Sequence, residues 1–200
     1  MLTGTSDYYI AYDRHPEYPN RDAQAIFHKD NPNEPITGWC RSVSVVGLVQ
    51  GTSEYYARTI ENGNERLTQI FHISDPANPV YDISDHKLFA GNALYLDKDT
   101  AIFEDDEDYY SWFYNKIYVY DSHSNNLITL NLEPYDIKKR NLLINPDYIQ
   151  HRVIPMIGYD RKGYIYDIST NNMQTFDSAK EMQEYLDHLV GKNITNDLNY

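Results

Sequence analysis

The best local case for a catalytic site in the sequence begins at His72. Asp75, Asp82, Asp85 and His86 all follow within fourteen residues of it. A carboxylate beside an imidazole can transfer protons or bind a metal ion. Aspartate is also common in loops, because its side chain accepts hydrogen bonds from turn amides. We prefer the loop interpretation and keep a small enzyme with a site near His72–His86 as an alternative.

Motifs of several enzyme and metal-binding families are absent from the sequence. It contains no G-x-G-x-x-G, G-x-x-x-x-G-K-[ST], G-x-S-x-G or H-E-x-x-H pattern. Cys40 is the single cysteine, so the usual structural zinc sites cannot form. An acidic loop begins at Asp97, but Ile102 stands where a calcium-binding EF-hand requires glycine. We therefore predict no catalytic residue, no metal, no cofactor and no enzymatic activity.

The most distinctive segment is a run of five acidic residues that leads directly into aromatic residues. Acidic residues alone are most simply a solvated loop. Tyrosine and tryptophan, however, supply much of the anchoring energy at protein interfaces, and nearby charge sets the encounter rate and the choice of partner. We interpret this segment as a partner-binding surface. Its residues are Glu104, Asp105, Asp106, Glu107, Asp108, Tyr109, Tyr110, Trp112 and Tyr114.

Overall charge favours proteins over nucleic acid as partners. Thirty acidic residues stand against seventeen basic ones, which gives a formal net charge of −13. Phosphate backbones are bound by dense lysine and arginine, and the only basic cluster is Lys138, Lys139 and Arg140. We expect no direct nucleic-acid binding. A negative field favours basic proteins or metal ions, and the twenty tyrosines suit half-buried positions at interfaces.

Stretches rich in β-branched and aromatic residues alternate with turn residues from Trp39 onward. This pattern is typical of short strands joined by hairpins. Within the strand that ends at Ile73, alternation places His72 on the opposite face from its two apolar neighbours. The predicted strands span residues 39–50, 54–60, 67–73, 94–96, 100–103, 112–120, 127–132, 153–159, 163–168 and 173–176.

One amphipathic helix is predicted over residues 178–190. Ser178 can cap its first turn, and Glu181 completes a capping box. Gly191 follows as the expected stop. The apolar residues that share one face at helical spacing are Met182, Tyr185, Leu186, Leu189 and Val190.

Tyr-Asp pairs recur along the chain and raise the alternative of a β-propeller. Those from residue 81 onward begin at Tyr81, Tyr120, Tyr135, Tyr159 and Tyr166, at intervals of 39, 15, 24 and 7 residues. Propeller blades repeat every ~40 residues, and these intervals show no fixed period. The predicted fold class is therefore mainly β, a β-rich α+β fold. We expect an antiparallel twisted sheet or sandwich of about 8–10 short strands, with the C-terminal helix packed on it.

The domain organisation is expected to comprise an arm and one body. Prolines at positions 16, 19, 32 and 35 push the residues before them out of helical conformations. Residues 1–37 are therefore predicted as an irregular, ordered N-terminal arm, and residues 38–200 as a single β-rich domain. Both ends are polar, and we expect neighbouring subunits to hold them.

These features favour a non-enzymatic protein that works through protein–protein contacts in an oligomer or larger complex. The leading hypothesis is a structural component of a phage or viral particle. The alternative is a soluble acidic inhibitor, an immunity or anti-defence protein, that masks a basic partner surface. The sequence shows no signal-peptide pattern and no apolar run near ~20 residues. We therefore expect no membrane partner and a location in the cytoplasm or an assembled virion.

Overall fold

The computed structural model describes residues 8–15, 18–41, 47–48, 54–62, 65–83, 90–105 and 111–191. The two chain ends lie outside these ranges. No helix in the described residues is both long enough and apolar enough to span a membrane.

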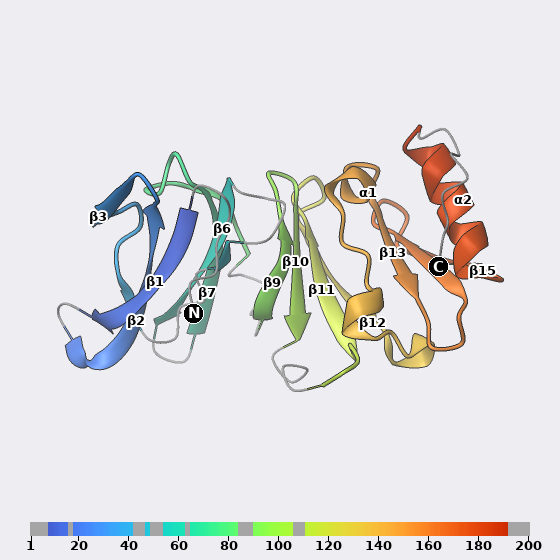
Figure 1. The fold of residues 1–200 in the computed structure, drawn as a ribbon, viewed down its shortest axis with the longest axis horizontal. Helices are drawn as coiled ribbons and strands as arrows, with labels where there is room; N and C mark the ends of the chain where they lie inside the picture. Colours follow the sequence, from blue (N-terminus) through green and yellow to red (C-terminus); the bar gives the residue numbers. More distant parts are fainter. Residues whose placement is uncertain are drawn as a thin grey trace. The chain divides into compact units, whose positions relative to one another are not determined.

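The strands of the described residues form four small sheets (Figure 1). The first contains β1 (Tyr8–His15), β2 (Tyr18–His28), β3 (Asn31–Pro35) and β4 (Cys40–Arg41). The second contains β5 (Gly47–Leu48), β6 (Tyr55–Asn62), β7 (Glu65–His72) and β8 (Pro79–Asp82). The third contains β9 (Ala90–Leu96), β10 (Thr100–Asp105), β11 (Lys116–Asp121) and β12 (Asn126–Asn131). The fourth contains β13 (Val153–Ile157), β14 (Gly163–Asp167) and β15 (Asn172–Phe176).

The predicted fold class is confirmed: the described residues are mainly β, the strand pairing is antiparallel, and a helix follows near the C-terminus. The strands are divided among four sheets rather than gathered in one. The chain also divides into two compact units, residues 1–109 with 117–130 and residues 110–116 with 131–200. This division differs from the single domain predicted for residues 38–200.

Neighbouring sheets of the first unit share apolar cores. Ile10 and Ile26 of the first sheet cluster with Phe71 of the second. Ile70, the residue before Phe71, belongs instead to a cluster with Phe103 of the third sheet. Because successive side chains of a strand point to opposite faces, β7 is buried on both sides. This explains the apolar character of both faces of the second sheet.

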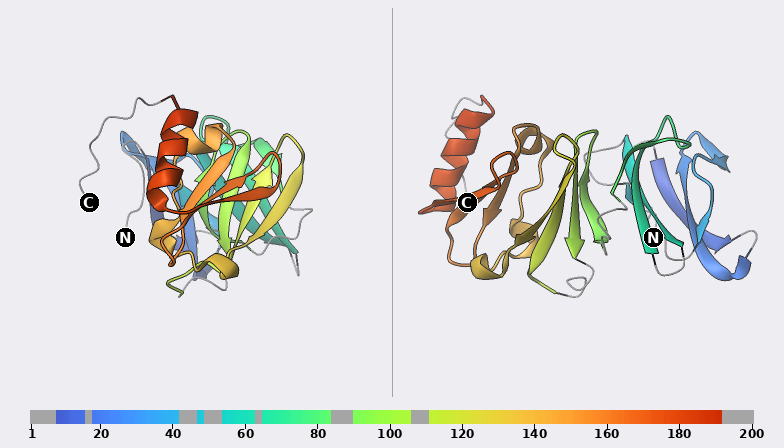
Figure 2. Two further views of the ribbon diagram at one scale, coloured as in Figure 1. Left: turned by 90° about the vertical axis from the view of Figure 1, so that its right-hand side faces the viewer. Right: turned by 180° about the vertical axis from the view of Figure 1, so that it is seen from behind.

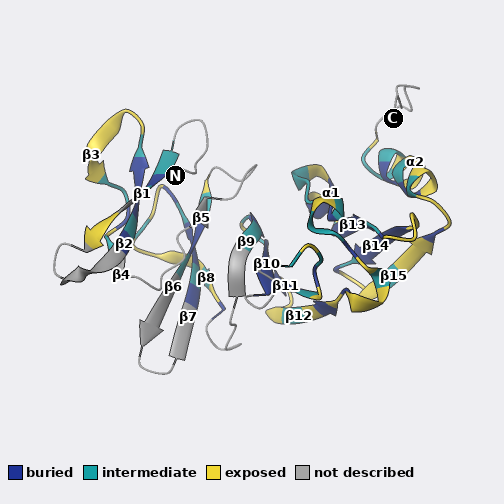
Figure 3. Cartoon of the chain, turned by 60° about the horizontal axis from the view of Figure 1, so that its bottom comes forward, coloured by how far each residue is buried: buried dark blue, intermediate teal, exposed yellow. Residues whose placement is uncertain are grey.

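The predicted N-terminal arm is wrong for its described residues, which form β1, β2 and β3. The prolines disfavour helix in the residues before them, yet a strand tolerates proline at a sheet edge or at its first residue. β3 follows β2 at the end of the strand order, and residues 31–34 are exposed (Figure 3). Pro79 likewise begins the edge strand β8.

The predicted helix is confirmed as α2 (Ala179–Leu189), which packs on the β13–β15 sheet of the second unit (Figure 2). The Ser178 hydroxyl accepts a hydrogen bond from the Glu181 amide at 3.2 Å. Met182 and Leu186 are buried against the sheet. A second, short helix, α1 (Pro146–Gln150), contributes Tyr148 to the same core.

Two hairpins carry the same turn, 46 residues apart. After β11, the Tyr120 hydroxyl donates to the Asn125 side-chain oxygen at 2.8 Å. After β14, the Tyr166 hydroxyl donates to Asn171 at the same distance. Both asparagines have positive φ, 51° and 55°, a conformation that asparagine tolerates well.

The aspartate that follows each tyrosine closes the turn. Asp121 accepts the amide of His123 at 3.2 Å, and Asp167 accepts the amide of Ser169 at 2.8 Å. These are the local side-chain caps that favour a tight turn. Two of the Tyr-Asp pairs are therefore parts of one recurring turn.

A glycine in the fourth sheet permits the helix to approach. A Cβ added to Gly163 would lie 2.5 Å from the Met182 Cβ. We predict that Gly163→Ala lowers the free energy of unfolding by about 1–3 kcal/mol, the usual cost of overpacking. Gly38→Ala is the matched control, since its added Cβ meets nothing within 4 Å. Urea denaturation of both variants measures the difference, and equal midpoints would refute the close packing.

Buried tyrosines predict sensitivity to alkaline pH. Burial and the hydrogen bond to Asp160 raise the pKa of Tyr164 to about 12, and burial with the charge of Asp167 raises the pKa of Tyr166 to about 12. The unfolded value is about 10, so the folded state keeps protons that the unfolded state has lost. Their stabilisation is complete below pH ~10 and is lost as pH rises toward ~12.

We therefore expect the free energy of unfolding of the wild type to fall steeply across this pH window. The double variant Tyr164→Phe/Tyr166→Phe lacks both titrating hydroxyls, and its curve should fall less steeply. Denaturant titrations at closely spaced pH values measure both slopes. Parallel curves would contradict the raised pKa values.

Candidate functional site

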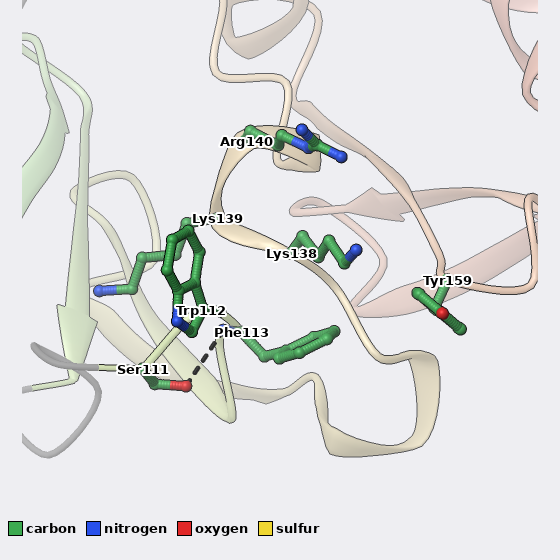
Figure 4. Close-up of a pocket in the computed structure, with 7 residues that line it drawn as sticks. All are labelled: Ser111, Trp112, Phe113, Lys138, Lys139, Arg140 and Tyr159. Atoms are coloured by element: carbon green, nitrogen blue, oxygen red, sulfur yellow. Dashed lines mark hydrogen bonds between the residues drawn. The ribbon is translucent and has the colours of Figure 1, made fainter.

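A pocket of about 680 Å³ lies in the second unit (Figure 4). We call it the aromatic–basic pocket because aromatic and basic side chains line it. Its lining residues are Ser111, Trp112, Phe113, Lys138, Lys139, Arg140 and Tyr159.

Backbone pairing between two segments distant in sequence builds this pocket. Phe113 and Lys138 form an isolated antiparallel bridge. On either side of it, the Tyr114 amide donates to the Ile137 carbonyl at 2.9 Å, and the Lys139 amide donates to the Trp112 carbonyl at 3.1 Å. The strand predicted over residues 112–120 is therefore wrong in its first part, because residues 112–114 pair with residues 137–139 and β11 begins at Lys116.

The side chains of the paired segment differ in burial. Trp112 is 85% exposed, whereas Tyr114 is buried with 5% exposure. The Ser111 hydroxyl accepts the Phe113 amide at 3.0 Å and closes the turn that carries the indole (Figure 4). Trp112 is thus an anchored but largely uncovered aromatic side chain.

The basic side chains lie against aromatic rings. The Lys138 ammonium is 4.8 Å from the centre of the Tyr159 ring and 5.8 Å from that of Phe113. The Lys139 ammonium lies 5.2 Å from the centre of the Tyr114 ring. Each such cation–π contact is worth about 0.5–1 kcal/mol at an exposed site. The aromatic rings therefore hold both ammonium groups near the pocket.

A short turn positions the backbone of the third basic residue, Arg140. Arg140 lies in the 3-10 turn Lys139–Asn141 and is exposed. The Asn141 amide donates to the Lys138 carbonyl at 2.8 Å, and its side chain donates to the carbonyl of Ile157 at 3.1 Å. Asn141 thereby attaches the basic turn to the end of β13. The result is a preformed group of aromatic faces and cations, which can bind a molecule that is partly apolar and partly anionic.

Among the described residues of the predicted partner-binding segment, some are buried and do not lie on the surface. Glu104 and Asp105 lie in β10 and are buried, with 4% and 5% exposure. The Tyr118 hydroxyl donates to Asp105 at 3.2 Å. Five further residues lie outside the described part of the chain: Asp106, Glu107, Asp108, Tyr109 and Tyr110.

The last two residues of that prediction, Trp112 and Tyr114, belong to the segment that builds the pocket, although Tyr114 is buried. Sequence reasoning missed that the structure brings the basic cluster Lys138–Arg140 to the exposed tryptophan. The cluster is visible in the sequence, but its composition by itself bears only on nucleic-acid binding. Tyr159 joins it from the end of β13, a position that no local pattern connects with Trp112.

The second candidate site surrounds His72, at the end of β7. As predicted, His72 lies opposite its buried neighbours Phe71 and Ile73. Its Nδ1 is 2.7 Å from the Ser74 hydroxyl, and its Nε2 is 3.6 Å from a Glu54 carboxylate oxygen. A serine, a histidine and a carboxylate thus lie in the order of a hydrolase relay, but the two ring nitrogens are exchanged, since in that relay Nε2 faces the serine and Nδ1 faces the carboxylate.

The carboxylates predicted to serve His72 have other partners. Asp75 accepts hydrogen bonds from the Asn78 amide groups at 3.1–3.3 Å, and Asp82 accepts one from Gln69 at 2.7 Å. Asp85 and His86 lie outside the described ranges. Among the residues that the structure describes, no three His, Cys, Asp or Glu side chains gather where they could hold a metal ion.

The contacts between His72 and Ser74 are explained by the turn in which both residues lie. The Ser74 amide also donates to His72 Nδ1, at 3.2 Å, so the imidazole caps the turn that follows β7. Ser74 is exposed, and the Glu54 side chain is 68% exposed. Electrostatic stabilisation of a reaction needs a water-excluded site. We therefore interpret His72 as a turn cap.

Comparisons with known proteins give a short family match and a fold. A family model described as NUMOD1 domain matches residues 164–188, from β14 through most of α2. No curated protein sequence matches the chain. The chain is similar to the crystal structure of HIRA(644-1017), with a TM-score of 0.54 at 11% identity over 88% of this chain and 51% of that chain.

Two further solved structures also match over 88% of this chain. They are the WD40 beta propeller domain of Doa1 (11% identity, 52% of that chain, TM-score 0.41) and BamB from Moraxella catarrhalis (12% identity, 48% of that chain, TM-score 0.47). The chain thus spans about half the length of the structures it matches. The likeness to HIRA(644-1017) shows the fold alone, which is β-propeller-like.

The turn-cap interpretation of His72 predicts the absence of hydrolase activity at this relay. Purified wild-type protein and the Ser74→Ala variant should hydrolyse p-nitrophenyl acetate at the same slow rate, since Ser74 acts in the turn and not as a nucleophile. A rate that drops by more than ~100-fold in the Ser74→Ala variant would restore the enzyme alternative, because loss of a true nucleophile has effects of that order or more.

Proposed function

We propose that this chain is a non-enzymatic protein-interaction module whose partner contacts the aromatic–basic pocket. The observation that carries the proposal is the exposed Trp112 beside the basic turn. A large aromatic side chain left in water and rimmed by charge is the composition of a protein-binding hot spot. Tryptophan and arginine are the residues most enriched in such positions.

The fold supports the same role. Trp112 and Lys138–Arg140 lie outside the regular sheets, on connections that backbone hydrogen bonds hold in place. Binding residues are disproportionately found on loops that a rigid scaffold positions. Preformed loops also lose little conformational entropy when a partner binds.

The two specific roles predicted from the sequence, a virion component and a soluble inhibitor, remain predictions. A place in a phage or viral particle is one form of such an interaction module. A soluble acidic inhibitor is another, in which acidic residues rather than the aromatic–basic pocket would contact the partner. The two roles therefore differ in whether binding depends on Trp112.

The proposal predicts that Trp112→Ala weakens the native complex by about 10-fold or more, which corresponds to at least ~1.4 kcal/mol. The tagged chain is returned to its source cells, and the complex is measured by size-exclusion chromatography at matched expression. Val80→Ala is the control, because Val80 is an exposed apolar residue of β8, outside the pocket. Full retention of the complex by Trp112→Ala would overturn the proposal.

A further inference from the structure

We infer that the aromatic–basic pocket receives an acidic peptide segment of a partner protein, anchored by one aromatic or large aliphatic side chain. This inference rests on the proposed function and adds the chemistry of the partner. The apolar part of the site is formed by Trp112, Phe113 and Tyr159. A volume of about 680 Å³ lies within the range of ordinary ligand pockets and accommodates a bulky side chain with its backbone.

Charge complementarity identifies the rest of the occupant. Within the described residues, neither Lys138 nor Arg140 forms an ion pair with a carboxylate of this chain. The Lys138 ammonium faces the Tyr159 ring, and the Arg140 side chain is exposed. Lysine and arginine bind carboxylates through short, charge-assisted hydrogen bonds. An acidic residue on either side of the apolar anchor would therefore meet a cation already held at the pocket.

The same observations favour a peptide over nucleic acid. Affinity for a phosphate backbone increases with the number of cations that contact it, and the pocket supplies three. The chain as a whole carries a net charge of −13, which repels a polyphosphate more strongly than a short peptide with few charges. A short acidic peptide needs only one or two ionic contacts, because its apolar side chain supplies the remaining binding energy.

The test uses the full chain and a fluorescein-labelled peptide, Glu-Glu-Phe-Glu-Glu, in fluorescence anisotropy titrations at 0.15 M salt. We expect saturable binding to the wild type. The double variant Lys138→Gln/Arg140→Gln and the single variant Trp112→Ala should each weaken binding by about 10-fold or more. The double variant Lys162→Gln/Lys180→Gln is the matched control, since it removes two exposed charges of the same unit outside the pocket.

Altered peptides separate the two parts of the inference. Replacing the phenylalanine by alanine should abolish binding, and replacing the glutamates by glutamines should weaken it by about 10-fold or more. Equal binding of the glutamine peptide would overturn the acidic partner. Tighter binding of a thymidine oligonucleotide, lost in the same pocket variants, would overturn it in favour of nucleic acid.

The complex measured in the source cells distinguishes failure of this inference from failure of the proposed function. If Trp112→Ala dissociates the native complex but Lys138→Gln/Arg140→Gln does not, the interaction module stands and the acidic partner is wrong. If neither variant alters the complex, both proposals are wrong. Loss of the complex in both variants, together with peptide binding, supports both.

Discussion

The pairing of residues 112–114 with residues 137–139 is the interaction on which the candidate site depends. Trp112 and Lys138 are 26 residues apart in the sequence, and two backbone hydrogen bonds, one on each side of the Phe113–Lys138 bridge, bring their segments together. Because residues 112–114 pair elsewhere, β11 begins only at Lys116, and the indole of Trp112 is left exposed to solvent. Three cation–π contacts, one of them with the buried ring of Tyr114, then hold the side chains of Lys138 and Lys139. A single short ladder thus creates both the aromatic and the charged part of the pocket.

Tyrosine serves the interior of this protein as much as its surface. Tyr95 and Tyr166 are almost fully buried, and their hydroxyls donate to Asp97 and Asn171. A buried hydroxyl needs such an acceptor, because leaving it unpaired costs about 1–3 kcal/mol. Tight turns supply the acceptor within a few residues of the tyrosine. The many tyrosines are typical of interfaces, but hydrogen bonds to turn residues give Tyr95, Tyr120 and Tyr166 roles within the fold.

Local patterns predicted much of the fold, and they failed where the decisive information was non-local. The helix over residues 178–190 was correct because Ser178, its apolar stripe and Gly191 act within a few residues of one another. Prolines misled the prediction of the first 37 residues, since the sequence does not reveal which strand lies at an edge. The interval of 46 residues between Tyr120 and Tyr166 was hidden by the unrelated Tyr-Asp pairs at Tyr135 and Tyr159.

The sequence by itself determined many of the strands after residue 39 and where the helix begins, because propensity, capping and turn chemistry are short-range effects. Only the tertiary structure decided that Glu104 and Asp105 are buried and that Lys138–Arg140 lies beside Trp112. Burial and the meeting of distant side chains depend on which strands pair and stack. Those choices follow from the summed packing of many residues, which no local pattern contains.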